Sequence, residues 1–328
     1  MWGPVLGIDP THMSFPVVAR MIHILMSGLL GDVSSLFVMN QPTNIAWFDE
    51  WVAYLRSQGV TIATDVEVED FVMQGGQVSS VLLKNKKTGE HFSDSADFFV
   101  CGLSNEVIGA MVQKNPDLAQ YPSLHKTAAL ADKCHQVQLS VQIFLNKKIV
   151  YPTNDVNILY LPDSPWALII EPEDEIWGKS FSSNPAVKSV LSVGICQTDV
   201  PGILHPKPFT ECSEQEIKEE VWAQIVKSYE YSHITFEDGS PVNDTSTVLF
   251  YIWDSFRFDT ADKRVDIWEP KFSNNANSLA LQPAVVTEIQ NFFFATAYAK
   301  TDRYIYSMEA AADAGTLAAN AIIKKQNA

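Results

Sequence analysis

The sequence contains no two glycines separated by a single residue, although 15 of its 328 residues are glycine. Neither the GxGxxG loop of dinucleotide-binding folds nor a Walker A loop is present anywhere in the chain. These loops need glycine because the backbone must approach a phosphate closely. If a dinucleotide binds, its pyrophosphate is therefore not held by the usual loop of this polypeptide.

Basic residues are few, with 23 Lys and Arg against 39 Asp and Glu, which gives a net charge of −16. A charge of this sign repels phosphate backbones and anionic lipid headgroups, so a nucleic acid partner is not expected. The longest apolar run, Met21 to Gly31, is too short to cross a bilayer and lies between Arg20 and Asp32. No transmembrane segment is predicted, and the first ten residues lack the basic region of a signal peptide.

Cysteine and histidine are sparse and lack the spacings of redox or metal motifs. The four cysteines include no CxxC pair, which indicates reduced thiols and a cytoplasmic protein. The seven histidines form no HxH or HExxH pair, so no metal site is predicted. Ser104 lies where a nucleophile elbow would place it, but Glu106 replaces the second glycine, which favours a helix cap. No catalytic residue can be identified.

Apolar periodicity divides the first third of the chain into helices and a β-meander. The apolar segment 14–39 predicts a buried helix. Residues 42–57 carry apolar side chains at helical spacing, with Thr43 or Asn44 as the cap and Gly59 after the end. Residues 66–101 alternate with period two between turns, which predicts a strand followed by a meander that ends at Phe98 to Cys101.

The second part of the chain reads as further strands around two helices. Alternation from about residue 137 to 143 predicts a strand with one wet face, and strands follow near 157–161, 166–171, 188–195 and 247–254. Ser213 and Glu216 predict a capping box for a helix that buries Ile217 and Val221. The last helix is expected from about Ser307 to Lys325.

The C-terminal segment carries a family resemblance. Residues 291–301, followed by Ser307-Met308-Glu309 and the alanine-rich stretch to 319, resemble the closing flavin motif of the flavin-containing amine oxidase, phytoene desaturase and hydroxysqualene dehydroxylase superfamily. In that family a strand, a short loop and a helix lie beside the flavin ring. The start of a helix suits the anionic edge of a reduced flavin, because its backbone N–H groups are unpaired and carry partial positive charge.

Earlier segments agree with this resemblance in order along the chain. Residues 41–60 resemble the returning helix of the family, Val68 fits the strand whose backbone meets adenine, and 98–103 fits a strand that ends near the cofactor. The resemblance thus implies FAD as the cofactor, with Val68, Tyr298, Ser307, Met308 and Glu309 as its binding residues. Val68, Phe294 and Met308 are then expected around one cleft.

Two departures from the family concern the phosphates. The N-terminal GxGxxG unit is missing, and Ala297 stands where the family has an aspartate beside the pyrophosphate and ribityl chain. A hydrogen bond of that kind is worth on the order of 1 to 3 kcal/mol of cofactor affinity. The missing strand and helix would leave a neighbouring edge bare, so the strand at 292–295 is expected to border a partner chain or a hydrophobic groove.

These observations predict an α/β fold, α+β overall, with a truncated Rossmann-like three-layer FAD-binding domain and a mixed, mainly antiparallel substrate domain. We expect 1–40 to be a helical segment of the substrate lobe, 41–115 and 286–328 a remnant FAD-binding lobe, and 116–285 the substrate lobe. The predicted function is the C-terminal portion of an FAD-dependent oxidoreductase, inactive alone, that acts on a small apolar or amine substrate. A separate dinucleotide-binding chain, or a second copy, would be its partner. The alternative is a flavin-free structural or interaction protein that keeps the fold.

Overall fold

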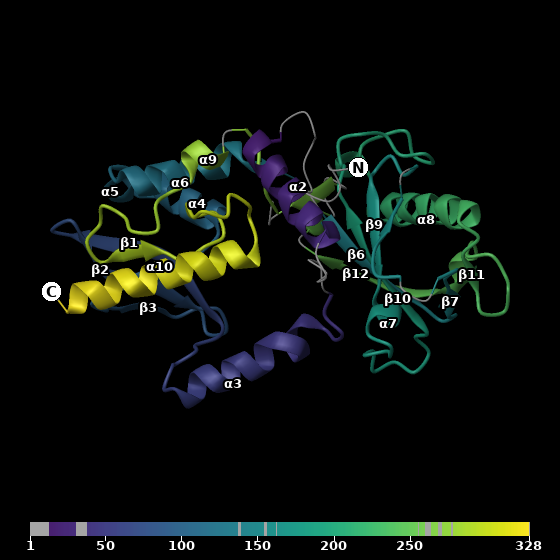
Figure 1. Cartoon of the computed structure of the whole chain (residues 1–328), viewed down its shortest axis with the longest axis horizontal. Coiled ribbons are helices and arrows are strands. Elements are labelled where there is room, and N and C mark those ends of the chain that lie inside the picture. The colour runs from purple at the N-terminus through teal and green to yellow at the C-terminus, as the bar shows by residue number, and fades with distance from the viewer. Residues whose placement is uncertain are drawn as a thin grey trace. The chain divides into compact units, whose positions relative to one another are not determined.

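The computed structural model describes residues 13–30, 38–136, 139–153, 156–161, 163–254, 256–259, 264–267, 271–276 and 278–327. The chain divides into two compact units (Figure 1). Unit 1 comprises 1–10, 36–59 and 136–271, and unit 2 comprises 11–35, 60–135 and 272–328. Both mix helices with sheets that are mainly antiparallel. No helix within the described ranges is long and apolar enough to cross a membrane.

The two units differ in extent from the lobes expected from the sequence. Residues 41–59 belong to unit 1, whereas 116–135 and 272–285 belong to unit 2. Packing explains why residues 116–135 belong to unit 2. Gly109 of α4 (Asn105–Lys114) lies so close to α6 (Pro122–Lys133) that an added Cβ would come within 2.9 Å of the Ala131 side chain. The tight approach of these helices keeps residues 116–135 with the segment that precedes them.

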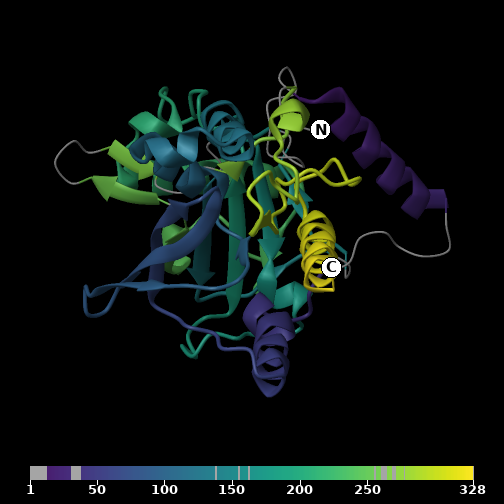
Figure 2. The same cartoon turned by 90° about the vertical axis from the view of Figure 1, so that its left-hand side faces the viewer.

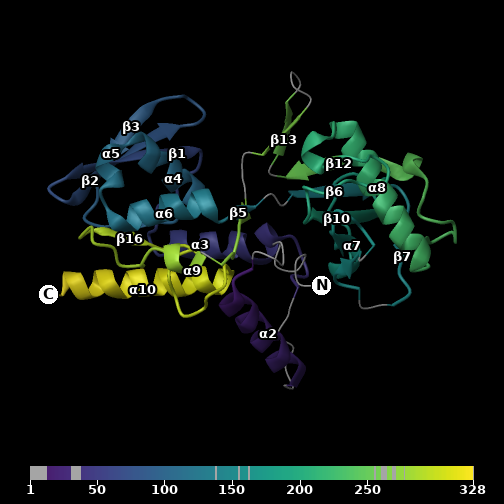
Figure 3. The ribbon, with the colours of Figure 1, turned by 90° about the horizontal axis from the view of Figure 1, so that it is seen from above.

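Unit 1 is built on a five-stranded antiparallel sheet whose strand order is β12-β6-β10-β9-β8. Every second side chain of β6 (Leu139–Leu145) packs in the main core, including Val141 and Ile143, because side chains alternate between the faces of a strand. Helix α8 (Glu214–Tyr231) covers that face, as Figure 3 shows. The other strands are β8 (Leu159–Tyr160), β9 (Leu168–Pro172), β10 (Ser189–Ile195) and β12 (Val248–Asp254).

The strands and helix predicted for this unit are confirmed, including the wet face of β6, where Ser140 and Gln142 are half-buried. Residues 137 and 138 of that prediction lie outside the described residues. Smaller elements complete the unit: β7 (Ile149–Val150), α7 (Glu173–Ile176), η3 (Phe209–Glu211), β11 (Thr235–Phe236), η4 (Thr245–Thr247), β13 (Phe256–Asp259) and β14 (Arg264–Ile267).

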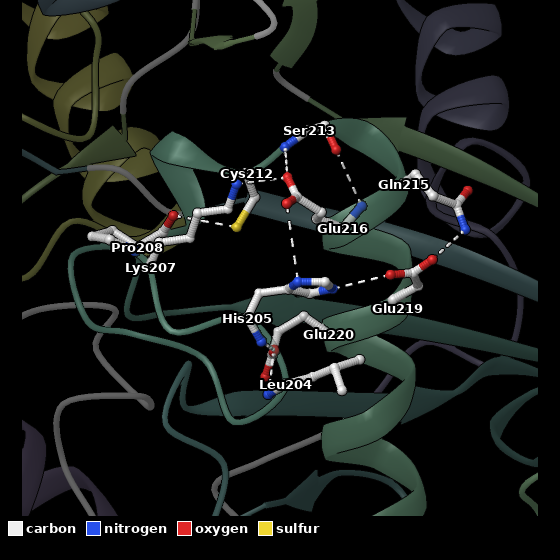
Figure 4. Close-up of polar contacts among 10 residues, drawn as sticks. All are labelled: Leu204, His205, Lys207, Pro208, Cys212, Ser213, Gln215, Glu216, Glu219 and Glu220. Carbon is white, nitrogen blue, oxygen red and sulfur yellow. Dashed lines mark hydrogen bonds and ion pairs between the residues drawn. The ribbon is translucent and has the colours of Figure 1, made fainter.

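The start of α8 has the predicted capping box. The Glu216 backbone N–H donates to Ser213 Oγ, and the Ser213 N–H donates to the Glu216 carboxylate, at 3.4 and 2.7 Å. Lys207 Nζ donates to the same carboxylate at 2.8 Å (Figure 4). These bonds hold the pKa of Glu216 at about 2, with the bond from Lys207 as the largest cause. The charged side chain therefore fixes the loop before α8 to the first turn of the helix.

Unit 2 contains the predicted meander, formed by β1 (Val66–Gln74), β2 (Gln77–Asn85) and β3 (His91–Asp94), which is blue in Figure 2. A separate parallel pair joins β4 (Phe99–Cys101) to β16 (Phe292–Phe294). Figure 3 shows β16 between α6 and α10 (Met308–Gln326). Other elements of the unit are α2 (Phe15–Leu30), α5 (Pro116–Ala119) and α9 (Ser278–Leu281). The pair of β5 (His135–Gln136) with β15 (Lys271–Phe272) lies where the chain passes from one unit to the other.

Two helices form where predicted but are not placed as predicted. Helix α2 was expected to be buried, yet Phe15, Ile22 and Met26 are exposed. It is anchored at its start, where the Ser14 N–H donates to the Asn274 carbonyl and Val17 is buried. At these three exposed positions apolar composition therefore does not correspond to burial. Residues 31–37 of the predicted segment lie outside the described residues.

The helix predicted at 42–57 begins as a π-helix, η2 (Asn44–Phe48), and continues as α3 (Asp49–Ser57). The predicted cap is wrong, because Thr43 makes no side-chain cap bond and Asn44 lies inside the π turn. The predicted stop is confirmed, since Gly59 follows with a φ of +83°, a conformation that favours glycine.

Candidate functional site

The parallel pair in unit 2 brings two loops to one edge. The strands β4 and β16 run in the same direction, with Cys101 opposite Phe294 at their carboxyl ends. The chain leaves β4 through Leu103 and Ser104 into α4, and it leaves β16 through Thr296 to Tyr298. Ligands of α/β folds bind at the carboxyl ends of parallel strands, because the loops there are free to diverge. We call this region, made of residues 101–106, 295–298 and 306–309, the strand-end site.

Tyr298 joins the two loops of the strand-end site. Its side chain is buried, and its hydroxyl donates to the Leu103 carbonyl at 2.9 Å. The Ala295 N–H donates to the Cys101 carbonyl at 2.9 Å. Burial raises the pKa of Tyr298 well above its ordinary value, so the phenol stays protonated and remains a donor. Tyr298 thus fixes the geometry of the site, and its hydroxyl is already engaged by the backbone.

The buried polar atoms of the site that lack a hydrogen-bond partner within the described residues are Thr296 Oγ1 and one atom each of Asn105 and Glu106 on α4. The Asn105 side chain is 2% exposed, and its Nδ2 donates to no acceptor. The adjacent Glu106 has a buried Oε1 that accepts from no donor. Burial raises the pKa of Tyr306, and the negative charge of Glu106 adds to the shift, which places this carboxylate near the segment before α10. Unmet buried donors and acceptors are rare, and here a ligand group could satisfy both.

Helix α10 begins at the same region with its N-terminus open. Ser307 is the N-cap, and its Oγ accepts the Ala310 N–H at 3.2 Å. Met308 is 58% exposed and Glu309 is also exposed. The first N–H groups of a helix have no partner within the helix, so those of Met308 and Glu309 can meet an anionic or polar ligand. The opposite face is buried through Ala310, Ala314 and Ala318, as these small residues predict.

The predicted binding residues Val68, Tyr298, Ser307, Met308 and Glu309 all lie in unit 2. Val68 packs against the core cluster of this unit, in which Phe294 is fully buried. Val68 lies beside a β-bulge in β1, where the register shifts between Val68 and Asp70. A bulge interrupts the ladder and leaves a residue without its pairing partner. The predicted backbone contact of Val68 therefore coincides with an irregular point of the strand.

The expectation that the strand at 292–295 has an open edge is wrong. On one side β16 pairs with β4, and on the other the Phe294 N–H donates to the Val285 carbonyl at 2.9 Å, with Val286 bridging to Phe293. Both edges of β16 are thus covered. Within the described residues no strand pairs with the outer edge of β4, and the Val100 side chain on that strand is 50% exposed. The open edge of the pair is therefore that of β4.

The residues of the strand-end site fit the flavin end of FAD better than its phosphates. An open helix start and the unmatched buried polar atoms of Asn105 and Glu106 suit the polar edge of a flavin ring. Position 297 is alanine, and the chain has no two glycines separated by a single residue, the spacing of a loop that admits a pyrophosphate. The described residues thus include groups that would suit one end of such a cofactor only.

Comparisons with known proteins give distant structural likenesses. No protein-family model matches the chain, and no curated protein matches it. An oxidoreductase from Methanosarcina mazei aligns with a TM-score of 0.47 and 10% identity over 83% of this chain and 53% of its own. A glycerol-3-phosphate dehydrogenase from Bacillus halodurans, complexed with FAD, aligns with a TM-score of 0.39 and 11% identity over 81% and 40%. A myxobacterial FAD-dependent halogenase aligns with a TM-score of 0.38 and 12% identity over 82% and 49%.

This chain therefore spans about half, or less, of the length of these structures. The structures named are oxidoreductases or FAD-dependent enzymes, but TM-scores below 0.5 define neither a family nor a fold for this chain. Any functional inference has to come from the residues of the chain itself.

Sequence reasoning missed Asn105 and Glu106, because a polar pair at the start of a helix is ordinarily a capping segment. It also missed an acidic pair on the second face of the unit 1 sheet. Burial raises the pKa of Glu173 to about 7, and the carboxylate of Glu171 adds to the increase, whereas a hydrogen bond with Ser192 opposes it. The only sequence signal was the acidic run at 171–175, which reads as a solvated turn.

The raised pKa of Glu173 predicts a pH dependence of stability in unit 1. Between its ordinary value of 4.5 and about 7, the folded chain keeps a proton that the unfolded chain releases. The free energy of unfolding should therefore fall as the pH rises through this window. In Glu173→Gln this part of the decline should disappear, so the variant should be the more stable one above pH 7. Urea unfolding of both chains at several pH values measures this pH dependence of the free energy of unfolding.

The matched control for this measurement is Glu237→Gln, which removes an exposed carboxylate of the same unit. Its pH profile should follow that of the unchanged protein. A Glu173→Gln profile that also follows the unchanged protein would contradict the assignment of a raised pKa to Glu173.

Proposed function

We propose that this chain is the flavin-contacting and substrate-binding portion of an FAD-dependent oxidoreductase of desaturase or amine oxidase type. The dinucleotide-binding unit would come from a polypeptide outside these 328 residues. The observation that carries the proposal is the open outer edge of β4, next to the strand-end site. A Rossmann-like domain has further parallel strands at such a position, so the missing unit would pair there.

The hydrogen bonding of β4 supports this arrangement. The Phe99 N–H donates to the Asn291 carbonyl at 2.8 Å, and the Cys101 carbonyl accepts from the Ala295 N–H at 2.9 Å. Backbone groups alternate in direction along a strand, so the Val100 N–H and carbonyl point to the outer edge. An unpaired edge is a template for another strand. A partner strand would extend the sheet. The phosphate loop of the partner polypeptide would then lie toward the strand-end site.

In this proposal unit 2 contacts the flavin and unit 1 supplies the substrate lobe. When bound, FAD would accept a hydride from a C–H or C–N bond of a small apolar or amine substrate. Ser307, Met308 and Glu309 would present the start of α10 to the polar edge of the ring. Val68 would offer its backbone, and Tyr298 would hold the two strand-end loops in register through its bond to Leu103.

A second function is favoured by a specific substitution. Ala297 cannot accept a hydrogen bond from the cofactor through its side chain, and no phosphate loop is present. These features favour a flavin-free structural or interaction protein that keeps the fold. On this alternative the open edge of β4 would pair with a protein that binds no nucleotide, or with a second copy.

A titration with FAD tests the proposal. The purified chain alone should be colourless and should not quench flavin fluorescence stoichiometrically, because nothing in it holds the pyrophosphate. Addition of a GxGxxG-bearing polypeptide encoded upstream should produce a yellow 1:1:1 complex. A yellow complex of the chain alone would show that the phosphates are held by other residues. A stable complex with such a polypeptide that never binds FAD would favour the flavin-free alternative.

A further inference from the structure

A cavity lies on the face of the unit 1 sheet that α8 does not cover. Side chains alternate between the two faces of β6, so Gln142 and Phe144 point away from the main core that holds Val141 and Ile143. Both side chains line the cavity, which measures about 240 Å³. A cavity of about 150 Å³ can hold benzene, so there is room for a small ring. We call it the β6–α7 cavity.

The floor of the cavity is apolar and well packed. Phe144 and its ladder neighbour Val190 line the cavity and are 9% and 6% exposed. Both belong to a small core cluster on this face, separate from the main core. Phe250 stacks on Phe144, with ring centres 4.4 Å apart and an angle of 18° between the rings. Because the stack holds the Phe144 ring, this wall is formed before any ligand binds.

Two further rings, from the segment after α7, form a second wall. Trp177 and Phe181 line the cavity, with ring centres 5.2 Å apart and an angle of 89° between the rings. Gly178 lies between them with a φ of +64°, which favours glycine and lets the chain turn directly after Trp177. Both side chains are half-buried, so part of each ring stays accessible. The Lys179 ammonium lies 4.5 Å from the centre of the Phe181 ring, which leaves the ring edge and the other face for contact with a flat ligand.

Gln142 supplies a polar group of the cavity that can meet a ligand. Its side chain is half-buried, and its amide makes no hydrogen bond within the described ranges. By contrast, the Asp174 carboxylate, which also lines the cavity, accepts from Lys148 Nζ at 2.5 Å and from the Val190 N–H at 2.8 Å. A side-chain amide offers both donors and an acceptor. A ligand group that also offers both, as a carboxamide does, is its complement.

We infer that the β6–α7 cavity binds a small aromatic molecule with a group that both donates and accepts hydrogen bonds, such as a carboxamide. The ring would pack on Phe144 and against Trp177 and Phe181, and the polar group would bond to the Gln142 amide. This inference does not depend on the proposed function, because all lining residues belong to unit 1 and none belongs to the strand-end site.

The test compares benzamide with cyclohexanecarboxamide, which share the amide and differ in the ring. Indole 15N–1H NMR of the full chain reports each tryptophan, and the signal absent from Trp177→Phe identifies Trp177. Benzamide should shift this signal. Its Kd should rise about tenfold in Gln142→Leu, which removes the amide and keeps a side chain of similar size. Cyclohexanecarboxamide should bind the unchanged chain several-fold more weakly, because a puckered ring loses the aromatic contacts.

The matched control is Gln197→Leu, the same change at an exposed position of unit 1 outside the cavity. It should bind benzamide as the unchanged chain does. If Gln142→Leu folds poorly, which a loss of dispersion among the indole signals would reveal, Ser180→Phe keeps the test decisive. Ser180 is an exposed lining residue, so a ring there should fill the space and stop benzamide from shifting the Trp177 signal.

Four results would overturn the inference. Benzamide could leave the Trp177 signal of the unchanged chain unmoved, or it could bind a folded Gln142→Leu chain with equal affinity. Cyclohexanecarboxamide could bind as tightly as benzamide, or Ser180→Phe could bind benzamide as the unchanged chain does.

Discussion

Replacement of Glu220 by alanine is expected to lower the free energy of unfolding of unit 1 by about 4 kcal/mol. The Glu220 carboxylate is fully buried, yet it is surrounded by donors. Its oxygens accept the backbone N–H groups of Ile203, Leu204 and His205 at 2.6, 2.8 and 2.8 Å. Gln224 Nε2 donates to it at 2.6 Å. Without the carboxylate the buried Gln224 amide and three part-buried backbone N–H groups would lose their acceptor.

The loop around Glu220 is shaped for this carboxylate. A Cβ added at Gly202 would come within 2.3 Å of the Glu220 Cδ, so only glycine lets the backbone close over the side chain. Gln224 in turn accepts from Ser164 Oγ and from the Trp166 N–H, which ties the loop and α8 to β9 through one chain of hydrogen bonds. Loss of Glu220 should therefore loosen more than one loop.

The matched control is Glu219→Ala, the adjacent and exposed position on the same helix. Glu219 pairs with His205 at the surface, where water screens the interaction, so its loss should destabilise the chain far less than loss of Glu220. Urea unfolding should separate the two variants by several-fold in free energy. Glu220→Gln should be intermediate, because its amide keeps one acceptor but turns an NH2 toward the loop donors. Equal losses for Glu219→Ala and Glu220→Ala would contradict the role of the buried carboxylate.

Glu220 also shows where sequence reasoning about this chain ends. The capping box of Ser213 and Glu216 could be predicted, because a cap and its partner lie three residues apart. Likewise, period-two alternation and the Gly75-Gly76 turn predicted the meander, and small residues predicted the buried face of α10. Each of these signals is local. By contrast, Glu220 looks like one more charge on an acidic helix until residues 202–205 fold over it.

The open edge illustrates the same limit. The sequence gives no indication that residues 284–286 return to cover the second edge of β16, because an isolated bridge needs no periodic pattern. Nor does it show that Asn105 and Glu106 are left without partners, since that depends on what lies above the ends of β4 and β16. Tyr298 and residues 307–309 of the strand-end site were predicted only through a family resemblance, and their contacts with a cofactor remain a prediction.

Val100→Pro is expected to abolish association through the outer edge of β4 while leaving the chain folded. The Val100 N–H points away from β16, so its loss removes no hydrogen bond within unit 2. Proline is tolerated at such an edge position, and the preceding Phe99 already has the extended conformation that proline requires. A docking strand, however, would lose a bond and meet the proline ring. The affinity of the docking strand for the β4 edge should fall on the order of 100-fold.

The experiment compares Val100→Pro with Val100→Thr, which keeps the N–H and a β-branched side chain. Light scattering on each chain alone reports pairing with a second copy, and scattering together with flavin absorbance in the presence of an upstream GxGxxG-bearing polypeptide reports the mixed complex. If the β4 edge is the docking strand, Val100→Thr behaves like the unchanged chain, and Val100→Pro gives a monomer that neither joins the complex nor turns yellow. A Val100→Pro chain that still forms the yellow complex would place the dinucleotide-binding unit at another surface. The flavin-free scaffold would instead be favoured if the unchanged chain forms a complex without flavin absorbance and Val100→Pro abolishes that complex. In that scaffold the β4 edge pairs two proteins without a cofactor.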